Sequence, residues 1–213
     1  MKTYTNEKLP RIKIPFDGVN LINRNYSQAY QDMFVLSMMD GKIGTYLEIG
    51  AYDPELKSNT LLLEQLGWTG FSIEINKIKW NRKNPIIIHD ALTFNYQKGF
   101  YNQFHFNYLS IDIEPSYKTF FVLLKLLSLG YTFDIITFEH DEYNQKDYTG
   151  QSVKEVSRKI LTEVFKYQLK VGDVCSTTKK PFEDWYVKPN QTTNKYPTIP
   201  NWGRLAERYI LND

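Results

Sequence analysis

Short apolar runs alternate with segments of helical periodicity along most of this chain. The runs that we expect as strands are residues 45–49, 70–75, 86–89, 106–111 and 133–139. Two segments between them, 54–66 and 115–129, are expected as helices, because each begins with a proline and is followed by a glycine. Such alternation is typical of a parallel sheet with helices on both faces.

The same pattern predicts further elements on either side of these strands. A first helix is expected after Ser27, its N-cap, with Gly41 just beyond its end. A charged helix at 152–165 is expected to precede two closing strands, in YQLKVGDVC and FEDWYVKP, that pair antiparallel at the sheet edge. The tail NWGRLAERYILND has Leu205, Tyr209 and Ile210 on one helical side and is expected to be a docking helix.

These elements predict a doubly wound α/β fold with a mostly parallel seven-stranded sheet, an antiparallel edge strand and helices on both faces. We expect an N-terminal arm at residues 1–25, which are polar and interrupted by prolines, one domain at 26–190, and a C-terminal docking segment at 191–213.

Composition narrows the class of protein. A chain of 213 residues fits one domain, and its net charge of +2 gives no reason to expect nucleic acid as a partner. The single cysteine, Cys175, excludes an internal disulfide and indicates a reducing compartment. There is no long apolar segment and no signal-peptide pattern, so we expect a soluble, cytoplasmic protein without a membrane partner.

The loop after the first strand reads YLEIGAYDP. Its Gly50 would let the backbone approach a ligand closely, but the loop lacks the further glycines of a pyrophosphate-binding turn. Glu48 would suit a cationic group instead. A turn glycine beside a structural acid explains the same residues equally well.

The second and third strands also end in acids. Glu74 lies 24 residues after Gly50, where an acid can accept hydrogen bonds from ribose hydroxyls, and this would fit either a nicotinamide cofactor or S-adenosylmethionine. Asp90 could accept from an adenine amino group, with Ala91 packing nearby. His89 is expected to be a strand residue of the sheet.

Ionisable residues are concentrated at the ends of the fourth and fifth predicted strands. Asp112 and Glu114 follow the fourth strand, and Glu139, His140 and Asp141 end the fifth. Carboxylates with one histidine could accept a proton or hold a divalent cation, although single acids on loops are commonly solvated or cap helices. We predict no metal ligand among them.

Several stretches together resemble the FkbM-type methyltransferase family. They are SQAYQDMFV, YLEIGAYDPELKSNTLLLEQLGWTGFSIEIN, YLSIDIEPSYKTFFVLLKL, FDIITFEHDEY, SRKIL and PFEDWYVKP, and they span about three quarters of the chain in order. The resemblance implies a Rossmann-like methyltransferase fold, S-adenosylmethionine as cofactor, and a small-molecule acceptor, usually a hydroxyl of a sugar or another natural product.

The resemblance also implies roles for individual residues. It assigns Glu48, Gly50, Ala51 and Asn59 to the first cofactor loop and its helix, Glu74 to the ribose, Asp90 and Ala91 to the adenine, and Asp112 and Glu114 to the acids after the fourth strand. Pro115 departs from the commoner D-x-E-G form of that last motif. For the catalytic base Asp112 is our first choice and His140 our second, with Glu114 and Glu139 supporting them.

Two other functions remain open at this point. Glu114-Pro115-Ser116-Tyr117 is a distorted D-P-P-Y motif, which suggests amino-group methylation of a nucleic-acid base, but such an enzyme needs a basic groove beside its pocket. A domain that binds S-adenosylmethionine or a nucleotide without turnover is the non-enzymatic alternative. The sequence fits a reductase less well, because the loop after the first strand lacks the glycines of a dinucleotide-binding turn.

Overall fold

A computed structural model describes residues 12–13, 15–98, 100–144, 149–176, 180–192 and 197–211. Its centre is a seven-stranded sheet in the order β3-β2-β1-β4-β5-β7-β6. The strands are β1 (Thr45–Ile49), β2 (Thr69–Glu74), β3 (Ile86–Ile88), β4 (His105–Ile111), β5 (Thr132–Glu139), β6 (Gln168–Cys175) and β7 (Pro181–Val187). The first five run parallel, and β7 is antiparallel to both β5 and β6.

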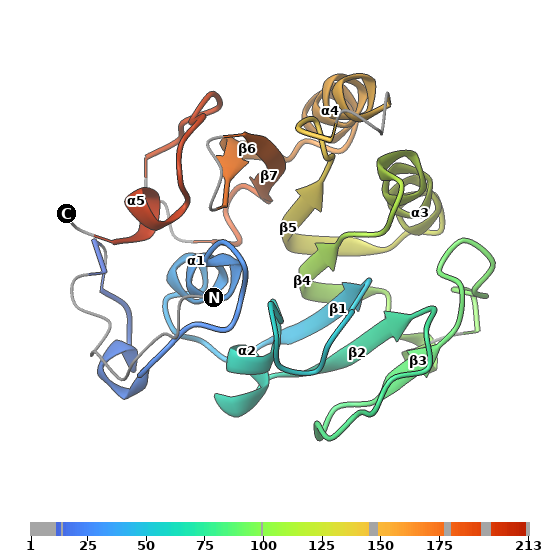
Figure 1. Ribbon diagram of the computed structural model, residues 1–213, viewed down its shortest axis with the longest axis horizontal. Coiled ribbons are helices and arrows are strands. Elements are labelled where there is room, and N and C mark those ends of the chain that lie inside the picture. Colours follow the sequence, from blue (N-terminus) through green and yellow to red (C-terminus); the bar gives the residue numbers. More distant parts are fainter. Residues whose placement is uncertain are drawn as a thin grey trace.

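Helices cover both faces of this sheet. They are α1 (Gln31–Met38), α2 (Leu61–Gln65), α3 (Ser116–Ser128), α4 (Gly150–Lys159), which continues as a π-helical segment (Ile160–Val164), and α5 (Glu207–Ile210). Short 3-10 turns occur at Val19–Leu21 and Phe100–Asn102. Figure 1 shows α1, α2 and α5 on one face and α3 and α4 on the other. In the described ranges no helix has the length and apolar character needed to cross a membrane.

Side-chain alternation along the strands builds one core on each face. On β1, Tyr46 packs into the core with α1 and α2, whereas Leu47 packs into the core with α3 and α4. On β7, Trp185 packs into the core with α1 and α2, and Tyr186 packs into the core with α3 and α4. Successive residues of a strand point to opposite faces, so a run that is apolar throughout supplies both cores.

The α/β class and the mostly parallel seven-stranded sheet are confirmed, and the arrangement is consistent with a Rossmann-like fold. Each of the first five strands begins and ends within one residue of its predicted bounds. The predicted antiparallel edge strand was misplaced, because β7 lies between β5 and β6 and β6 forms the edge. The last two strands do form an antiparallel pair on that side of the sheet.

The first helix begins later than predicted, and Ser27 is not its N-cap. The Ser27 hydroxyl donates to Asp32 Oδ1 at 2.7 Å, so its side chain bonds to a carboxylate inside the helix. Tyr30, at a φ of 62°, directly precedes Gln31, the first helical residue. Gly41 does follow the end of the helix in a left-handed conformation.

The helix predicted at 54–66 is reduced to α2. Asp53 Oδ1 accepts from the backbone N–H groups of Glu55 and Leu56, which closes a turn instead of a helix. Lys57 then adopts a φ of 59°, and Ser58 Oγ accepts from the N–H of Leu61, the first helical residue. Side-chain bonds to nearby backbone groups therefore replace the first turns of the predicted helix.

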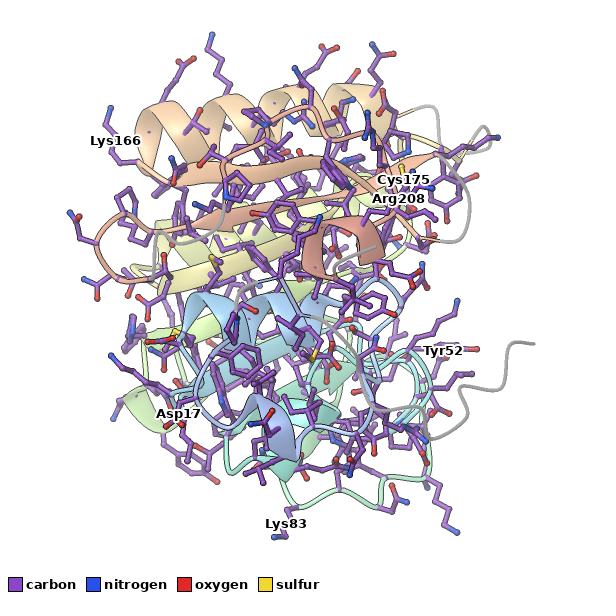
Figure 2. All side chains as sticks on the ribbon, turned by 90° about the vertical axis from the view of Figure 1, so that its left-hand side faces the viewer. Asp17, Tyr52, Lys83, Lys166, Cys175 and Arg208 are labelled. Carbon is purple, nitrogen blue, oxygen red and sulfur yellow. The ribbon has the colours of Figure 1, made fainter. Side chains whose placement is uncertain are left out.

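Both ends of the described chain pack on the α1 face. In the predicted N-terminal arm, of which residues 1–11 lie outside the described ranges, Ile12 and Phe16 are buried in this core and Ile12 bridges to Leu211. Tyr209 of α5 packs against Trp185. Backbone bonds join the end of β6 to the segment before α5, near Cys175 and Arg208 (Figure 2). The division into arm, domain and docking segment stays a prediction.

Candidate functional site

A cavity of about 430 Å³ lies where β1 to β5 end, which is the edge at which open α/β sheets bind ligands. Its volume falls within the range of small-molecule sites, about 300–1,000 Å³. Ten of the eleven residues predicted for the site line it: Glu48, Gly50, Ala51, Asn59, Glu74, Asp90, Ala91, Asp112, Glu114 and Glu139. His140 is the exception.

Gly50 holds the ends of β1 and β4 close together. Its φ is 87°, and a Cβ at this position would lie 1.7 Å from the carbonyl oxygen of Asp112. Asp112 in turn donates its N–H to Ile49 O at 3.0 Å. Only glycine fits this conformation and this contact, so the cavity wall depends on Gly50.

Glu74 is fixed at the end of β2 by three donors. Its Oε2 accepts from the N–H of Tyr52 at 2.9 Å, and its Oε1 accepts from the N–H and the side-chain amide of Asn76 at 2.8 and 2.9 Å. The Tyr52 side chain itself is exposed and points outward (Figure 2). Because a carboxylate has about four acceptor positions, Glu74 can still accept from a ligand in the cavity.

The end of β3 contributes a turn that faces the cavity. Asp90 Oδ1 accepts from the N–H of Leu92 at 2.8 Å, and Ala91 is buried beside it. The expectation that His89 belongs to the strand was wrong, since β3 ends at Ile88. His89 instead lines the cavity, with its Nδ1 2.9 Å from Asp90 O.

Glu48 is engaged by the protein itself. Ser72 donates to its carboxylate at 2.7 Å, and Arg82 Nη1 lies 3.6 Å away. Burial raises the pKa of Glu48, while Arg82 and Ser72 oppose that rise. Arg82 also bonds Glu64, Ser58 and Thr60, so it ties the loop before α2 to the sheet. Glu48 therefore helps to shape the cavity and is less free to bind a cation than the sequence suggested.

Asn59 lines the cavity and is held there by a bond to β4. Its side-chain amide donates to Ser110 Oγ at 2.9 Å. Among the described residues no donor reaches its Oδ1, which is fully buried. Buried polar atoms are normally paired, so this oxygen is an exception in the cavity wall.

Asp112 and Glu139 form a pair of neighbouring carboxyl groups on the cavity wall. Burial raises the pKa of both groups, and the negative charge of Asp112 raises that of Glu139 further. Two neighbouring carboxylates oppose each other's ionisation, so the environment of this pair favours the protonated form of Glu139. Lys57, which also lines the cavity, lowers the pKa of Asp112 through its positive charge and so opposes the effect of burial.

Two more groups surround this pair. Asp141 is 1% exposed, and its negative charge raises the pKa of Glu139 and of Tyr143, both of which line the cavity. Burial, followed by the nearby acids, raises the pKa of the Tyr143 hydroxyl. Glu114 lies at the exposed rim. The end of β4 and β5 is thus the most acidic part of the site.

The structure does not bring His140 to the cavity. It follows Glu139 directly, so strand alternation turns its side chain to the α4 face, where its Nε2 lies 3.7 Å from Asp184 Oδ1. Arg158 binds Asp184 through two bonds of 2.7 Å and holds the pKa of that buried carboxyl well below its usual range. His140 therefore lies against the buried Arg158–Asp184 ion pair, and we leave it out of the proposed chemistry.

The ion-pair network of Arg158, Asp173 and Asp184 overlaps with the one group of three His, Cys, Asp or Glu side chains in the described ranges whose ligand atoms converge within 4.8 Å: His140, Asp173 and Asp184. Arg158 and Lys154 already bond Asp173, at 2.8 and 3.1 Å. Two cations thus occupy the positions that a metal ion would need.

Sequence reasoning missed Gln31 and Glu183. Gln31 lines the cavity and donates to Glu183 Oε2 at 3.2 Å, and Glu183 also accepts from Trp185. Burial raises the pKa of Glu183 to about 8. In the antiparallel register Glu183 lies opposite Glu139. The alternation of FEDW was the available signal, but it becomes informative only once that register is known.

Comparison with models of known protein families gives no match. Comparison with curated proteins gives none either.

Substituting alanine at Gly50 and at Gly130 distinguishes the cost of backbone strain from the cost of a steric clash with Asp112. Both glycines have nearly the same φ, 87° and 86°, but a Cβ at Gly130 has open space around it. We expect Gly130→Ala to lower the free energy of unfolding by about 1–2 kcal/mol. Gly50→Ala should lower it by roughly 1–3 kcal/mol more, because Asp112 must move. Urea unfolding measures both, and equal losses would contradict the account of Gly50.

Glu183→Gln should change how stability depends on pH. With a folded pKa of about 8 against an ordinary 4.5, the folded protein keeps a proton that the unfolded chain releases. This contribution is complete below the unfolded pKa and is lost as pH rises through the folded one, at up to about 1.4 kcal/mol per pH unit.

We therefore expect the stability of wild type relative to Glu183→Gln to fall by about 1 kcal/mol per unit between pH 5 and 8. Urea unfolding at several pH values measures it. The exposed control Glu155→Gln should keep a constant difference from wild type. A constant difference for Glu183→Gln as well would show that Glu183 is ionised throughout.

Proposed function

We propose that this protein is an S-adenosylmethionine-dependent methyltransferase that methylates a hydroxyl of a small polar acceptor. The observation that carries the proposal is the Asp112–Glu139 carboxyl pair on the wall of a cavity that also contains Gly50 and Glu74. One end of the cavity suits an adenosine and the other suits proton transfer. The likeness to FkbM-type methyltransferases in the sequence supports the same reading.

The charge of the cavity favours a cationic cofactor over a dinucleotide. Six carboxyl groups line it, against two lysines, Lys57 and Lys118. A diphosphate is best held at a helix N-terminus directly after the glycine turn. Here the next helix, α2, begins only at Leu61, and a bonded turn at Asp53 fills the space between. A reductase is therefore disfavoured.

The residues that would hold S-adenosylmethionine follow from their positions. Glu74 would accept from the ribose, Asp90 and Ala91 would contact the adenine, and Asn59 would lie beside the amino-acid part of the cofactor. When bound, this cofactor supplies a methyl group activated by a positively charged sulfur. Gly50 would allow the close backbone approach that such a ligand needs.

The carboxyl pair would then handle the proton of the acceptor. A neutral hydroxyl is a poor nucleophile, and a positioned base adds roughly 10²- to 10⁴-fold to the rate. Asp112 would accept the hydroxyl proton, and Glu139, whose protonated form is favoured by burial and by the neighbouring acids, would stabilise it by a hydrogen bond. Holding the reactants in line contributes about 7 to 11 kcal/mol in addition.

Methylation of a nucleic-acid base is less well supported. The aromatic residue of the distorted motif, Tyr117, is 39% exposed, contacts Phe121, and is not part of the described cavity wall. A wall with six carboxyl groups also repels a phosphate backbone. A binding domain without turnover would not need a base beside its ligand.

S-Adenosylhomocysteine should raise the melting temperature of the protein, and NADH should not. Glu74→Gln should weaken S-adenosylhomocysteine binding by about 1.5 to 3 kcal/mol, roughly 10- to 150-fold, because charge-assisted bonds to the ribose are lost. Glu55→Gln, an exposed acid outside the cavity wall, is the matched control. Calorimetry measures the affinities. Stabilisation by NADH alone would contradict the proposal.

Asp112→Asn should lower turnover at least about tenfold with cofactor affinity nearly unchanged, because the loss lies in the transition state. Turnover is measured as S-adenosylhomocysteine release on an acceptor found by screening sugars and their conjugates. Glu139→Gln should have a similar effect. Wild-type turnover in both variants would place the chemistry elsewhere.

A further inference from the structure

The turn after β3 brings two neighbouring side chains to the cavity. His89 and Asp90 both line it. Asp90 Oδ1 accepts from the N–H of Leu92, whereas among the described residues no donor is bonded to its Oδ2. The proposed adenine contacts are Asp90 and Ala91, which leaves His89 without a role.

One contact determines which nitrogen of the His89 ring carries the hydrogen. Its Nδ1 lies 2.9 Å from the carbonyl oxygen of Asp90. A carbonyl oxygen can only accept, so Nδ1 is the donor. In the neutral ring Nε2 is then an acceptor, and in the part of the chain that the structure describes no donor is bonded to it.

The surroundings hold the ring and its turn in place. Phe94 packs edge-on against the His89 ring, with the ring centroids 5.5 Å apart and 71° between the ring planes. Lys125 of α3 donates to the carbonyl oxygens of Leu92 and Phe94 at 2.8 and 2.9 Å. A ligand that meets the turn therefore finds acceptors that are already oriented, which lowers the entropic cost of binding.

Two adjacent acceptors match a ligand group that has two donors. The 6-amino group of adenine has two N–H donors and no acceptor in use. Hypoxanthine has a carbonyl oxygen in the same place, and two acceptors would repel it. A site built to bond a particular polar group rejects an analogue that lacks the group, because its own polar atoms are then left unpaired.

We infer that His89 is a specificity residue of this cavity. Its Nε2 accepts from one N–H of the 6-amino group while Asp90 accepts from the other, and together they select 6-aminopurines over 6-oxopurines. This inference rests on the proposed methyltransferase function, because it concerns the adenine of S-adenosylmethionine.

Two substitutions separate the two nitrogens of the ring. Asparagine can place its side-chain amide N–H near the position of Nδ1, so His89→Asn keeps a donor for Asp90 O and removes the acceptor. Glutamine is longer and can place its oxygen near the position of Nε2, so His89→Gln keeps an acceptor. The control is His105→Asn, because His105 is exposed, bonds Thr132 through Nδ1 and lies outside the described cavity wall.

Calorimetry compares S-adenosylhomocysteine with S-inosylhomocysteine, at about pH 8, where imidazole groups are ordinarily neutral. We expect wild type and His105→Asn to bind the adenine form at least about thirtyfold more tightly. His89→Asn should lower this ratio by about three- to tenfold, the share of one hydrogen bond. His89→Gln should restore most of it.

An unchanged ratio in His89→Asn would overturn the inference, since His89 would then only stabilise the turn through Nδ1. An equal loss in His89→Gln, or equal affinity of wild type for the two ligands, would also overturn it. Glu74→Gln should weaken both ligands alike, because both carry the ribose. Failure of wild type to bind S-adenosylhomocysteine at all would instead overturn the proposed function, and the inference with it.

Discussion

Side-chain alternation at the carboxyl ends of the strands determines which charged groups of this protein meet. Glu139 and His140 are neighbours in the chain, as are Glu183 and Asp184, yet each pair is divided between the two faces of the sheet. One face receives Glu139 and Glu183 near the cavity. The other receives His140 and Asp184 beneath α4, where Arg158 binds Asp184 and His140 lies 3.7 Å from it. The cavity and the ion-pair network are built from the same strand ends. They lie on opposite faces of the sheet because successive residues of a strand point to opposite sides.

The two faces treat buried acids in opposite ways. Asp184 has Arg158 within 2.7 Å, and its pKa is held below its usual range, so it remains charged and fixes α4 to β7. Among the described residues no guanidinium bonds Glu139 or Glu183, and burial raises the pKa of both. Glu183 accepts from Gln31 and Trp185 instead. Burying a carboxyl without a cationic partner is costly, and titratable groups with shifted pKa values beside a cavity are typical of functional sites.

The sequence predicted most of the sheet because buried parallel strands are short apolar runs between turn residues. The ends of β1 to β5 follow from that pattern, whereas the insertion of β7 between β5 and β6 did not. The predicted first residues of α1 and α2 were wrong because side chains form local hydrogen bonds that replace the first helical turn. Ser27 bonds Asp32, and Asp53 bonds the backbone that follows it. His140 was placed in the site because an end-of-strand position was predicted, whereas its face was not. Glu183 was missed because its proximity to Glu139 depends on an antiparallel register between distant segments.

The central claim is that one cavity holds an adenosine at its β1–β3 end and performs proton transfer at its β4–β5 end. A crystal structure of the protein with S-adenosylhomocysteine tests it most directly. The account predicts the ribose hydroxyls on Glu74, the adenine beside Asp90 and Ala91, and the sulfur facing Asp112. Ligand density outside this cavity, or an inverted ligand with its adenine against Asp112, would contradict it.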